Sequence, residues 1–263
     1  MIEISALHIY PLKGGRGIAV DDVVLDRFGP RDDRRWLVID GDGAMITQRE
    51  VPLLCHVGAT PVPEGLELVA PGLGPVTIPI PNGQPPLSVR VWNDVVQVRA
   101  AGPEADRWCS EALATTARLV YCPDDSDRRT DPDYDPIGAP VSFADGYPIL
   151  LVGEASLAEL NRRLADPLPM NRFRPNVVVR GTEPFAEDGW KRFRVGGVPF
   201  DAVKPCFRCT VPTTDQVTGT RGPEPLRTMA TFRKRGSGVT FGMNVVHRAA
   251  GRLRVGDSIS LEG

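Results

Sequence analysis

The chain has 263 residues, and its 27 glycines and 26 prolines make up about a fifth of it, against about 12% in an average soluble protein. So many helix breakers exclude a long-helix bundle or a coiled coil, and a hydrophobic fraction of 41% argues against a disordered chain. The net charge of −2 lacks the basic footprint of a nucleic-acid-binding protein, so no nucleic acid is expected as a partner.

The location is expected to be cytoplasmic. The sequence contains no run of eighteen apolar residues that would predict a membrane-spanning helix, and its N-terminus lacks the pattern of a signal peptide. We therefore expect no association with a membrane.

The first hundred residues are predicted to be rich in short β-strands. Runs of branched and aromatic residues, separated by Gly, Pro and Asp turns, predict strands at 23–25, 36–39, 66–69, 76–78 and 89–92. The turn at residues 40–43 predicts a hairpin with 44–46. A helix is then predicted from Pro103, because apolar residues recur with helical spacing up to Leu113, and Cys109 falls on the buried face.

Residues 123–141 form an acidic, proline-rich segment that is predicted to be a loop or linker. It is either a solvated linker or a loop over a functional site. Beyond it, Ser156 and Glu159 predict a capping box for a helix that ends before Pro167. Strands are predicted again at 176–179, 193–195, 198–200 and 258–261. This order indicates an α+β, mostly β protein built on barrels.

Three clusters contain residues that could bind a ligand or take part in a reaction. Lys13 begins a basic, glycine-rich turn whose backbone N–H groups could face an anion. The segment 171–176 places two arginines beside a proline, where they could hold a phosphate. Cys206 and Cys209 form a CxxC next to cations that favour the thiolate. Five cysteines without a second CxxC do not predict a zinc ribbon or an iron–sulfur cluster in this chain.

These clusters occur together with further short motifs. In chain order the motifs are YPLK at 10–13, DRRWLV at 33–38, TQR at 47–49, DGYP at 145–148, EASL at 154–157, NRFRPN at 171–176, and CFRC at 206–209 followed by Thr213, Asp215 and Gly219. The ordered set resembles the MOSC proteins (molybdenum-cofactor sulfurase C-terminal domain), and most of all the branch of the mitochondrial amidoxime-reducing component and its bacterial relatives. Arg172 stands as an additional residue in the family's N-F-R-P-N signature.

The resemblance implies a fold and a site. The fold would be an N-terminal MOSC-type β-barrel domain in residues 1–122, the loop or linker 123–141, and a C-terminal MOSC barrel with a few helices in residues 142–263. The catalytic residues would be Cys209, as the ligand of molybdenum, and Asp145. The molybdenum cofactor (a molybdopterin) would be held by Lys13, Gly14, Arg34, Arg49, Tyr147, Arg174, Asn176 and Arg208. Gly14 replaces a Ser of the animal members, so its contact is expected to come from the backbone.

The activity that the resemblance implies is a two-electron reduction of small N-hydroxylated compounds. No cysteine follows Cys209, so we expect the electrons to come from a separate ferredoxin- or cytochrome-like protein. Two alternatives stay open. One is a non-enzymatic cofactor-binding or sulfur-carrying module with a persulfide on Cys209, although no pyridoxal-phosphate domain accompanies it. The other is a thiol redox protein that uses Cys206 and Cys209.

Overall fold

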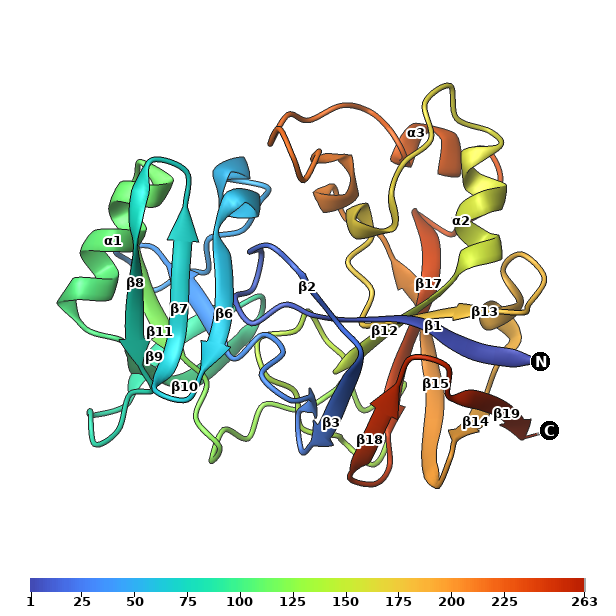
Figure 1. Ribbon diagram of the computed structural model, residues 1–263, viewed down its shortest axis with the longest axis horizontal. Helices are drawn as coiled ribbons and strands as arrows, with labels where there is room; N and C mark the ends of the chain where they lie inside the picture. The colour runs from blue at the N-terminus through green and yellow to red at the C-terminus, as the bar shows by residue number, and fades with distance from the viewer. Residues whose placement is uncertain (263) are drawn as a thin grey trace.

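The computed structural model describes residues 1–262, which form two lobes with both ends of the chain in the same lobe (Figure 1). The strands are β1 (Ile2–Ile9), β2 (Ile18–Val20), β3 (Asp22–Asp26), β4 (Gly29–Pro30), β5 (Trp36–Ile39), β6 (Gly58–Val62), β7 (Gly65–Ala70), β8 (Leu73–Pro79), β9 (Leu87–Val91), β10 (Asp94–Ala100), β11 (Arg118–Tyr121), β12 (Ile149–Gly153), β13 (Val177–Arg180), β14 (Arg192–Val195), β15 (Val198–Phe207), β16 (Lys234–Arg235), β17 (Gly238–His247), β18 (Gly251–Arg254) and β19 (Ser258–Glu262). The α-helices are α1 (Pro103–Leu113), α2 (Glu154–Asn161) and α3 (Leu226–Met229), and the 3-10 helices are η1 (Pro52–His56), η2 (Met170–Arg172), η3 (Ala186–Gly189) and η4 (Val211–Thr213).

The second lobe, which holds both ends of the chain, is a closed barrel of seven strands (Figure 1). They follow the order β12–β13–β1–β19–β14–β15–β17, and β17 pairs back onto β12. Only the β12–β13 pair is parallel within this ring. β1 lies in residues 1–122, yet its Leu7 is opposite Val177 of β13 and its Ile2 is opposite Ile259 of β19. The start of the chain therefore completes the barrel that residues 149–262 build.

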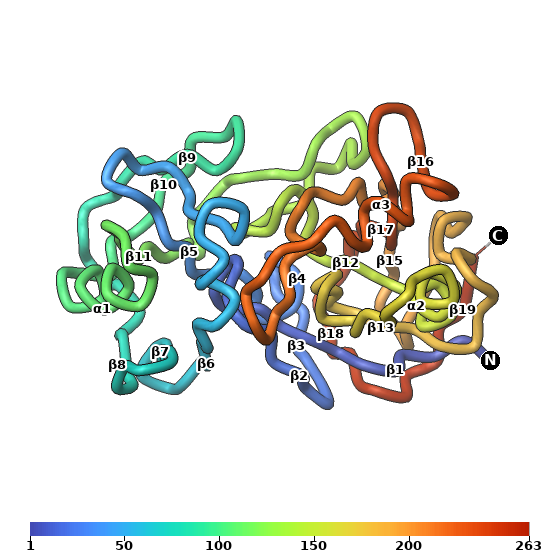
Figure 2. The backbone as a smooth tube through the Cα atoms, turned by 90° about the horizontal axis from the view of Figure 1, so that it is seen from above, coloured from blue at the N-terminus to red at the C-terminus, as the bar shows by residue number. Residues whose placement is uncertain are grey.

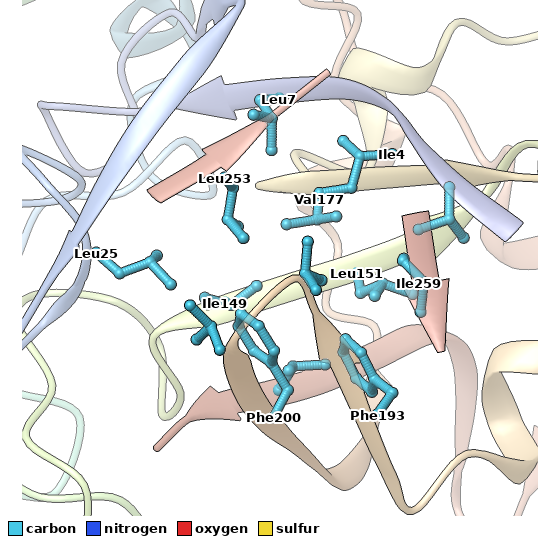
Figure 3. Close-up of a cluster of buried hydrophobic side chains, with 14 of the residues drawn as sticks. Ile4, Leu7, Leu25, Ile149, Leu151, Val177, Phe193, Phe200, Leu253 and Ile259 are labelled. Atoms are coloured by element: carbon cyan, nitrogen blue, oxygen red, sulfur yellow. The ribbon is translucent and has the colours of Figure 1, made fainter. Parts of the chain in front are cut away.

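Branched aliphatic and aromatic side chains fill the barrel. Ile4 and Leu7 of β1, Leu151 of β12 and Val177 of β13 point into the same core as Ile259 (Figure 3). The rings of Phe193 and Phe200 stack at 5.1 Å between centroids. β14 alternates exposed and buried residues, the pattern of a strand with one face on a core, whereas all five residues of β12 are buried.

The first lobe places its core between two small sheets and a helix. One sheet has the order β5–β11–β10–β9 and the other has the order β6–β7–β8. α1 begins with Pro103 at its first turn, where a missing N–H costs nothing, and ends at Leu113, and the capping residue Ala114 has a left-handed φ of 50°. Cys109 lies on the buried face of α1, so its predicted core position is confirmed, and burial raises the pKa of its thiol to about 12.

Loops tie the two lobes together. The segment between β15 and α3 reaches from the barrel to the first lobe (Figure 2), where the side-chain amides of Gln216 and Gln48 exchange two hydrogen bonds of 3.0 Å. The segment 123–141 contains no helix or strand. Its Asp135 is fully buried and receives a 2.7 Å ion pair from Arg248 of the barrel. This loop is therefore held by specific contacts.

The strand predictions agree with β3, β5, β7, β8, β9, β13, β14, β15 and β19. The predicted hairpin is present in short form, since Met45 pairs antiparallel with Ile39 across the turn and the Ile46 N–H donates to the Val38 carbonyl at 2.8 Å. One local prediction is wrong. Ser156 is not a helix cap, because α2 already begins at Glu154, and the Ser156 hydroxyl instead donates to the buried Glu187. No helix within residues 1–262 is long and apolar enough to cross a membrane.

Candidate active site

A cavity between the two lobes gathers the residues that the sequence motifs singled out. All ten line it: Lys13, Gly14, Arg34, Arg49, Asp145, Tyr147, Arg174, Asn176, Arg208 and Cys209. Gln48, Phe173, Cys206 and Phe207 are among the further lining residues. The lining therefore draws on loops and strand residues that are up to 231 positions apart in the sequence, from Lys13 to Asn244.

Lys13 and Gly14 lie in the turn after β1. The Lys13 backbone N–H donates to Trp36 at 2.8 Å, which holds this turn against β5. Gly14 has a φ of 82°, a conformation that favours glycine, and a Cβ there would lie 2.5 Å from the Leu54 side chain. The turn therefore brings its backbone close to the cavity in a way that larger residues would obstruct.

The Lys13 ammonium is buried and points at the loop before β12. Its Nζ donates to the Phe143 carbonyl at 2.7 Å and to the Asp145 carboxylate at 2.5 Å. Burial lowers the pKa of Lys13, although the Asp145 charge opposes this shift. The Asp145 side chain is 68% exposed, and the charge and hydrogen bond of Lys13 hold the pKa of its carboxyl below the ordinary value. At neutral pH this pair is therefore an ion pair, and Asp145 has no proton to donate.

Two arginines lie on the ring of one buried tyrosine. The guanidinium carbons of Arg34 and Arg174 are 4.9 and 4.2 Å from the Tyr10 ring centroid. Both arginines have a left-handed backbone, with φ of 50° and 57°. The Tyr10 hydroxyl donates to the Pro175 carbonyl at 3.1 Å, and burial raises the Tyr10 pKa to about 12. Two strained arginine conformations next to one cavity are typical of a functional site.

The Asn176 side chain links the two lobes through four hydrogen bonds. Its Oδ1 accepts from the Leu150 backbone N–H and from Arg34, and its Nδ2 donates to the His8 carbonyl and to Asp33. These four bonds occupy all the hydrogen-bonding positions of its amide. Asn176 therefore orients Arg34 and the buried Asp33 through protein contacts, and its place in the cavity lining leaves the cofactor contact a prediction.

Arg174 and Arg208 carry donors without a protein partner. Arg174 is 8% exposed, its Nη1 donates to the Gly15 carbonyl at 2.7 Å, and its Nη2 is buried without an acceptor within residues 1–262. Arg208 donates from Nη2 to the Phe173 carbonyl at 2.8 Å, while its Nε is likewise buried and unpartnered in the described chain. Burial lowers the pKa of Arg174 to about 10, and the nearby Arg34 charge acts in the same direction, which together outweigh the opposing charges of Asp33 and Asp145. Unpaired buried cations of this kind indicate an anion site.

The two cysteines of the CxxC differ in their surroundings. Cys206, near the end of β15, packs against the cluster of Phe173 and Phe241 and receives a 3.1 Å contact from Arg208 Nη1. Burial raises the pKa of Cys206. Cys209 lies just beyond the strand, half-buried in the cavity wall. Both sulfurs are free thiols, and within residues 1–262 no group of three or more His, Cys, Asp or Glu side chains is placed to hold a metal ion.

Sequence reasoning missed Trp92 at the edge of this site. It was predicted as the last residue of a strand, but β9 ends at Val91 and Trp92 is a turn residue. The Arg49 guanidinium carbon lies 4.2 Å from its ring centroid and Lys13 Nζ lies 5.9 Å from it. No local signal predicts this position, because it depends on how the β9–β10 hairpin approaches residues 40 to 80 positions away.

Comparison with known proteins matches nearly the whole chain. The family model of the MOSC N-terminal beta barrel domain matches residues 1–116, and that of the MOSC domain matches residues 138–260. Mitochondrial amidoxime reducing component 2 of Rattus norvegicus is 35% identical, over 97% of this chain and 82% of that protein. The Bos taurus protein of the same name is 34% identical over the same shares. Mitochondrial amidoxime-reducing component 1 of Homo sapiens is 31% identical, over 99% of this chain and 83% of its own length.

Proposed function

This chain belongs to the MOSC family that includes the mitochondrial amidoxime reducing components, and from this premise we propose that it is a molybdenum-cofactor-dependent reductase of N-hydroxylated compounds. In the proposed reaction the N–O bond of an R–NH–OH group breaks, the nitrogen gains a hydrogen, and the oxygen leaves as water. Two electrons from a separate donor protein and two protons from water balance the reaction.

The observation that carries the proposal is the excess of positive charge in the cavity wall. Lining cations come from Lys13, Arg34, Arg49, Arg174 and Arg208, whereas Asp145 is the one lining carboxylate within residues 1–262. Two of these arginines have buried donor atoms without acceptors. A group with a phosphate tail fits such a wall, because phosphate oxygens can accept from several arginines at once.

Cys209 would supply the protein ligand of the metal. It is a half-buried thiol in the same wall, and thiolate is a soft donor that suits a transition metal. Arg174 and Arg208 would bind the anionic end of the cofactor, while Asn176 orients Arg34 and Asp145 orients Lys13. When bound, the cofactor supplies the two-electron redox chemistry, and the protein supplies orientation and charge.

The test is to produce the protein in a host that makes the molybdenum cofactor and to measure its metal, its pterin and its activity. We expect close to one molybdenum per chain and reduction of a panel of amidoximes and hydroxylamines with an artificial electron donor. Cys209→Ser should lose the bound metal and at least about 100-fold of the activity, since the thiolate ligand disappears. Cys109→Ala, in the core of the first lobe, is the matched control and should retain both.

The alternatives give different results in the same experiment. Molybdenum well below one per chain, together with an unchanged Cys209→Ser variant, would contradict the reductase. A mass increase of one sulfur on Cys209 without reductase activity would instead support a sulfur-carrying module. A reversible disulfide between Cys206 and Cys209 that controls activity would support a thiol redox protein.

A further inference from the structure

Trp92 adopts a backbone conformation that bulky residues rarely adopt. Val91 of β9 pairs with Asp94 of β10, so Trp92 and Asn93 form a two-residue turn. Trp92 has a φ of 56°. Such turns normally use Gly, Asn or Asp at the position with positive φ. A large aromatic residue persists in this conformation only where the surrounding structure holds it there, and such residues gather at functional sites.

The Trp92 ring faces two cations of the candidate site. The guanidinium of Arg49 lies over the ring at 4.2 Å from its centroid, and Lys13 Nζ lies at 5.9 Å. The carboxylate of Glu50 is 3.9 Å from Arg49 and is 60% exposed, so this ion pair contributes little. The remaining side-chain contact of the guanidinium is a 3.2 Å hydrogen bond from Nε to Thr47.

An aromatic ring stacked on the plane of a guanidinium differs chemically from a carboxylate bound to the N–H groups at its edge. A carboxylate partner neutralises the charge and occupies the N–H groups of the guanidinium. An aromatic face attracts the cation through its quadrupole and leaves the N–H groups at the guanidinium edge free. Trp92 can therefore fix the direction of Arg49 while the charge and the donors of Arg49 stay available to an anion.

The hairpin tip is fixed to the loop that carries Asp145. The buried Arg128 donates from Nε to Asp94 at 2.7 Å, directly after the turn. Its Nη1 donates to the carbonyls of Ser142 and Ala144, and its Nη2 donates to the Asp145 carbonyl at 3.0 Å. The tip of the hairpin and the Asp145 loop thus form one rigid unit at the edge of the cavity.

We propose that Trp92 is a positioning residue that holds Arg49, and more weakly Lys13, for contact with an anionic group in the cavity, and that its strained backbone is retained for this purpose. The inference depends on the proposed function only in taking the molybdenum cofactor as the natural anion. The general claim is that an anion such as phosphate meets Arg49 while the ring of Trp92 orients it.

The decisive variant is Trp92→Gly, because it removes the ring and also relieves the backbone. We expect its melting temperature to stay equal or rise, while binding of inorganic phosphate to the cofactor-free protein weakens about 3- to 10-fold, in line with the loss of one cation–π contact. In the holoprotein, pterin should be lost faster on gel filtration by a similar factor. A residue with a merely structural role would instead lower the melting temperature.

Three further variants sharpen this test. Ala114→Gly relieves a left-handed residue at the end of α1, far from the cavity, and should raise stability without any change in phosphate binding. Trp92→Phe keeps an aromatic face and should restore most of the binding. In an Arg49→Gln background, Trp92→Gly should have no additional effect on phosphate binding, because the two residues act as a unit.

The inference is overturned if Trp92→Gly binds phosphate and retains pterin as the unchanged protein does, or if its effect persists at full size with Arg49→Gln. It also fails if the unchanged protein binds no phosphate, since Arg49 then meets no anion. These results are independent of the reductase proposal. Phosphate binding that depends on Trp92 in a protein that retains no molybdenum would support this inference and contradict the proposed function.

Discussion

The two halves of the chain hold the cations of the cavity in different ways. Lys13 and Arg34, from the first half, each have a carboxylate oxygen at 2.5 Å, from Asp145 and Asp33. Arg174 and Arg208, from the second half, have no ion pair within residues 1–262 and donate to backbone carbonyls instead. The first pair is thus fixed before any ligand arrives, whereas the second pair keeps charge that only a ligand can compensate.

The comparison predicts that replacing Arg34 lowers the stability strongly, whereas replacing Arg174, the other arginine that contacts Tyr10, changes it little or raises it. Arg34→Gln should lower the free energy of unfolding by about 4 kcal/mol, because it leaves the buried Asp33 carboxylate without its counter-charge. Urea denaturation measures this loss, and Arg31→Gln, three residues earlier and exposed, is the matched control. A loss below about 1 kcal/mol would mean that the hydrogen bonds from Tyr10 and Asn176 suffice for Asp33.

Tyr10, between the two arginines, makes stability depend on alkaline pH. Burial raises its pKa to about 12 in the folded protein, against an ordinary value of 10.0. The stability that Tyr10 contributes through this raised pKa is fully present below pH 10. It is lost as the pH rises through 12, because the unfolded chain then ionises the hydroxyl more readily than the folded protein does. We expect the unchanged protein to lose about 2–3 kcal/mol more than Tyr10→Phe between pH 9 and 12.

Denaturation at several pH values checks this difference, with the exposed Tyr134→Phe as the control that should behave like the unchanged protein. Equal alkaline losses in the unchanged protein and Tyr10→Phe would show that the Tyr10 hydroxyl ionises as easily in the folded protein as in the unfolded chain.

Arg174→Gln should be the mildest of these changes for the fold and still impair binding. Removing a buried cation that has no ion pair should change stability by less than about 1 kcal/mol or increase it. Phosphate binding by the cofactor-free protein should weaken about tenfold, because a charge-assisted hydrogen bond is lost. Isothermal titration measures it, and Arg162→Gln, at an exposed position directly after α2, is the control. A large loss of stability with unchanged binding would reverse the contrast between the two halves.

The ordered sequence motifs were sufficient to predict ten residues that line the cavity, but they did not predict the role of each residue. All ten predicted site residues lie around one space, although residues 13 and 209 have no local relation in the sequence. The task of Asn176 could not be predicted, since its four partners come from both lobes and meet only when β1 pairs with β13. Trp92 was missed because its position depends on a turn with positive φ, which its residue type does not indicate.

Strand propensity predicted fewer than half of the 19 strands, those with clear runs of branched and aromatic residues. The capping box at Ser156 failed, since the same pair of residue types is compatible with a buried hydroxyl that binds Glu187. The cytoplasmic location, the identity of the donor protein and the domain limits 1–122, 123–141 and 142–263 stay predictions.

The place of β1 in the barrel has a consequence for biosynthesis. Residues 2–9 are translated long before their pairing partners at 177–180 and 258–259. The barrel therefore closes only after translation of nearly the whole chain, and contacts between such distant residues form slowly. The Lys13 turn follows β1 directly and depends on the same closure. The complete lining of the cavity therefore exists only after these late strands have been translated and have paired with β1.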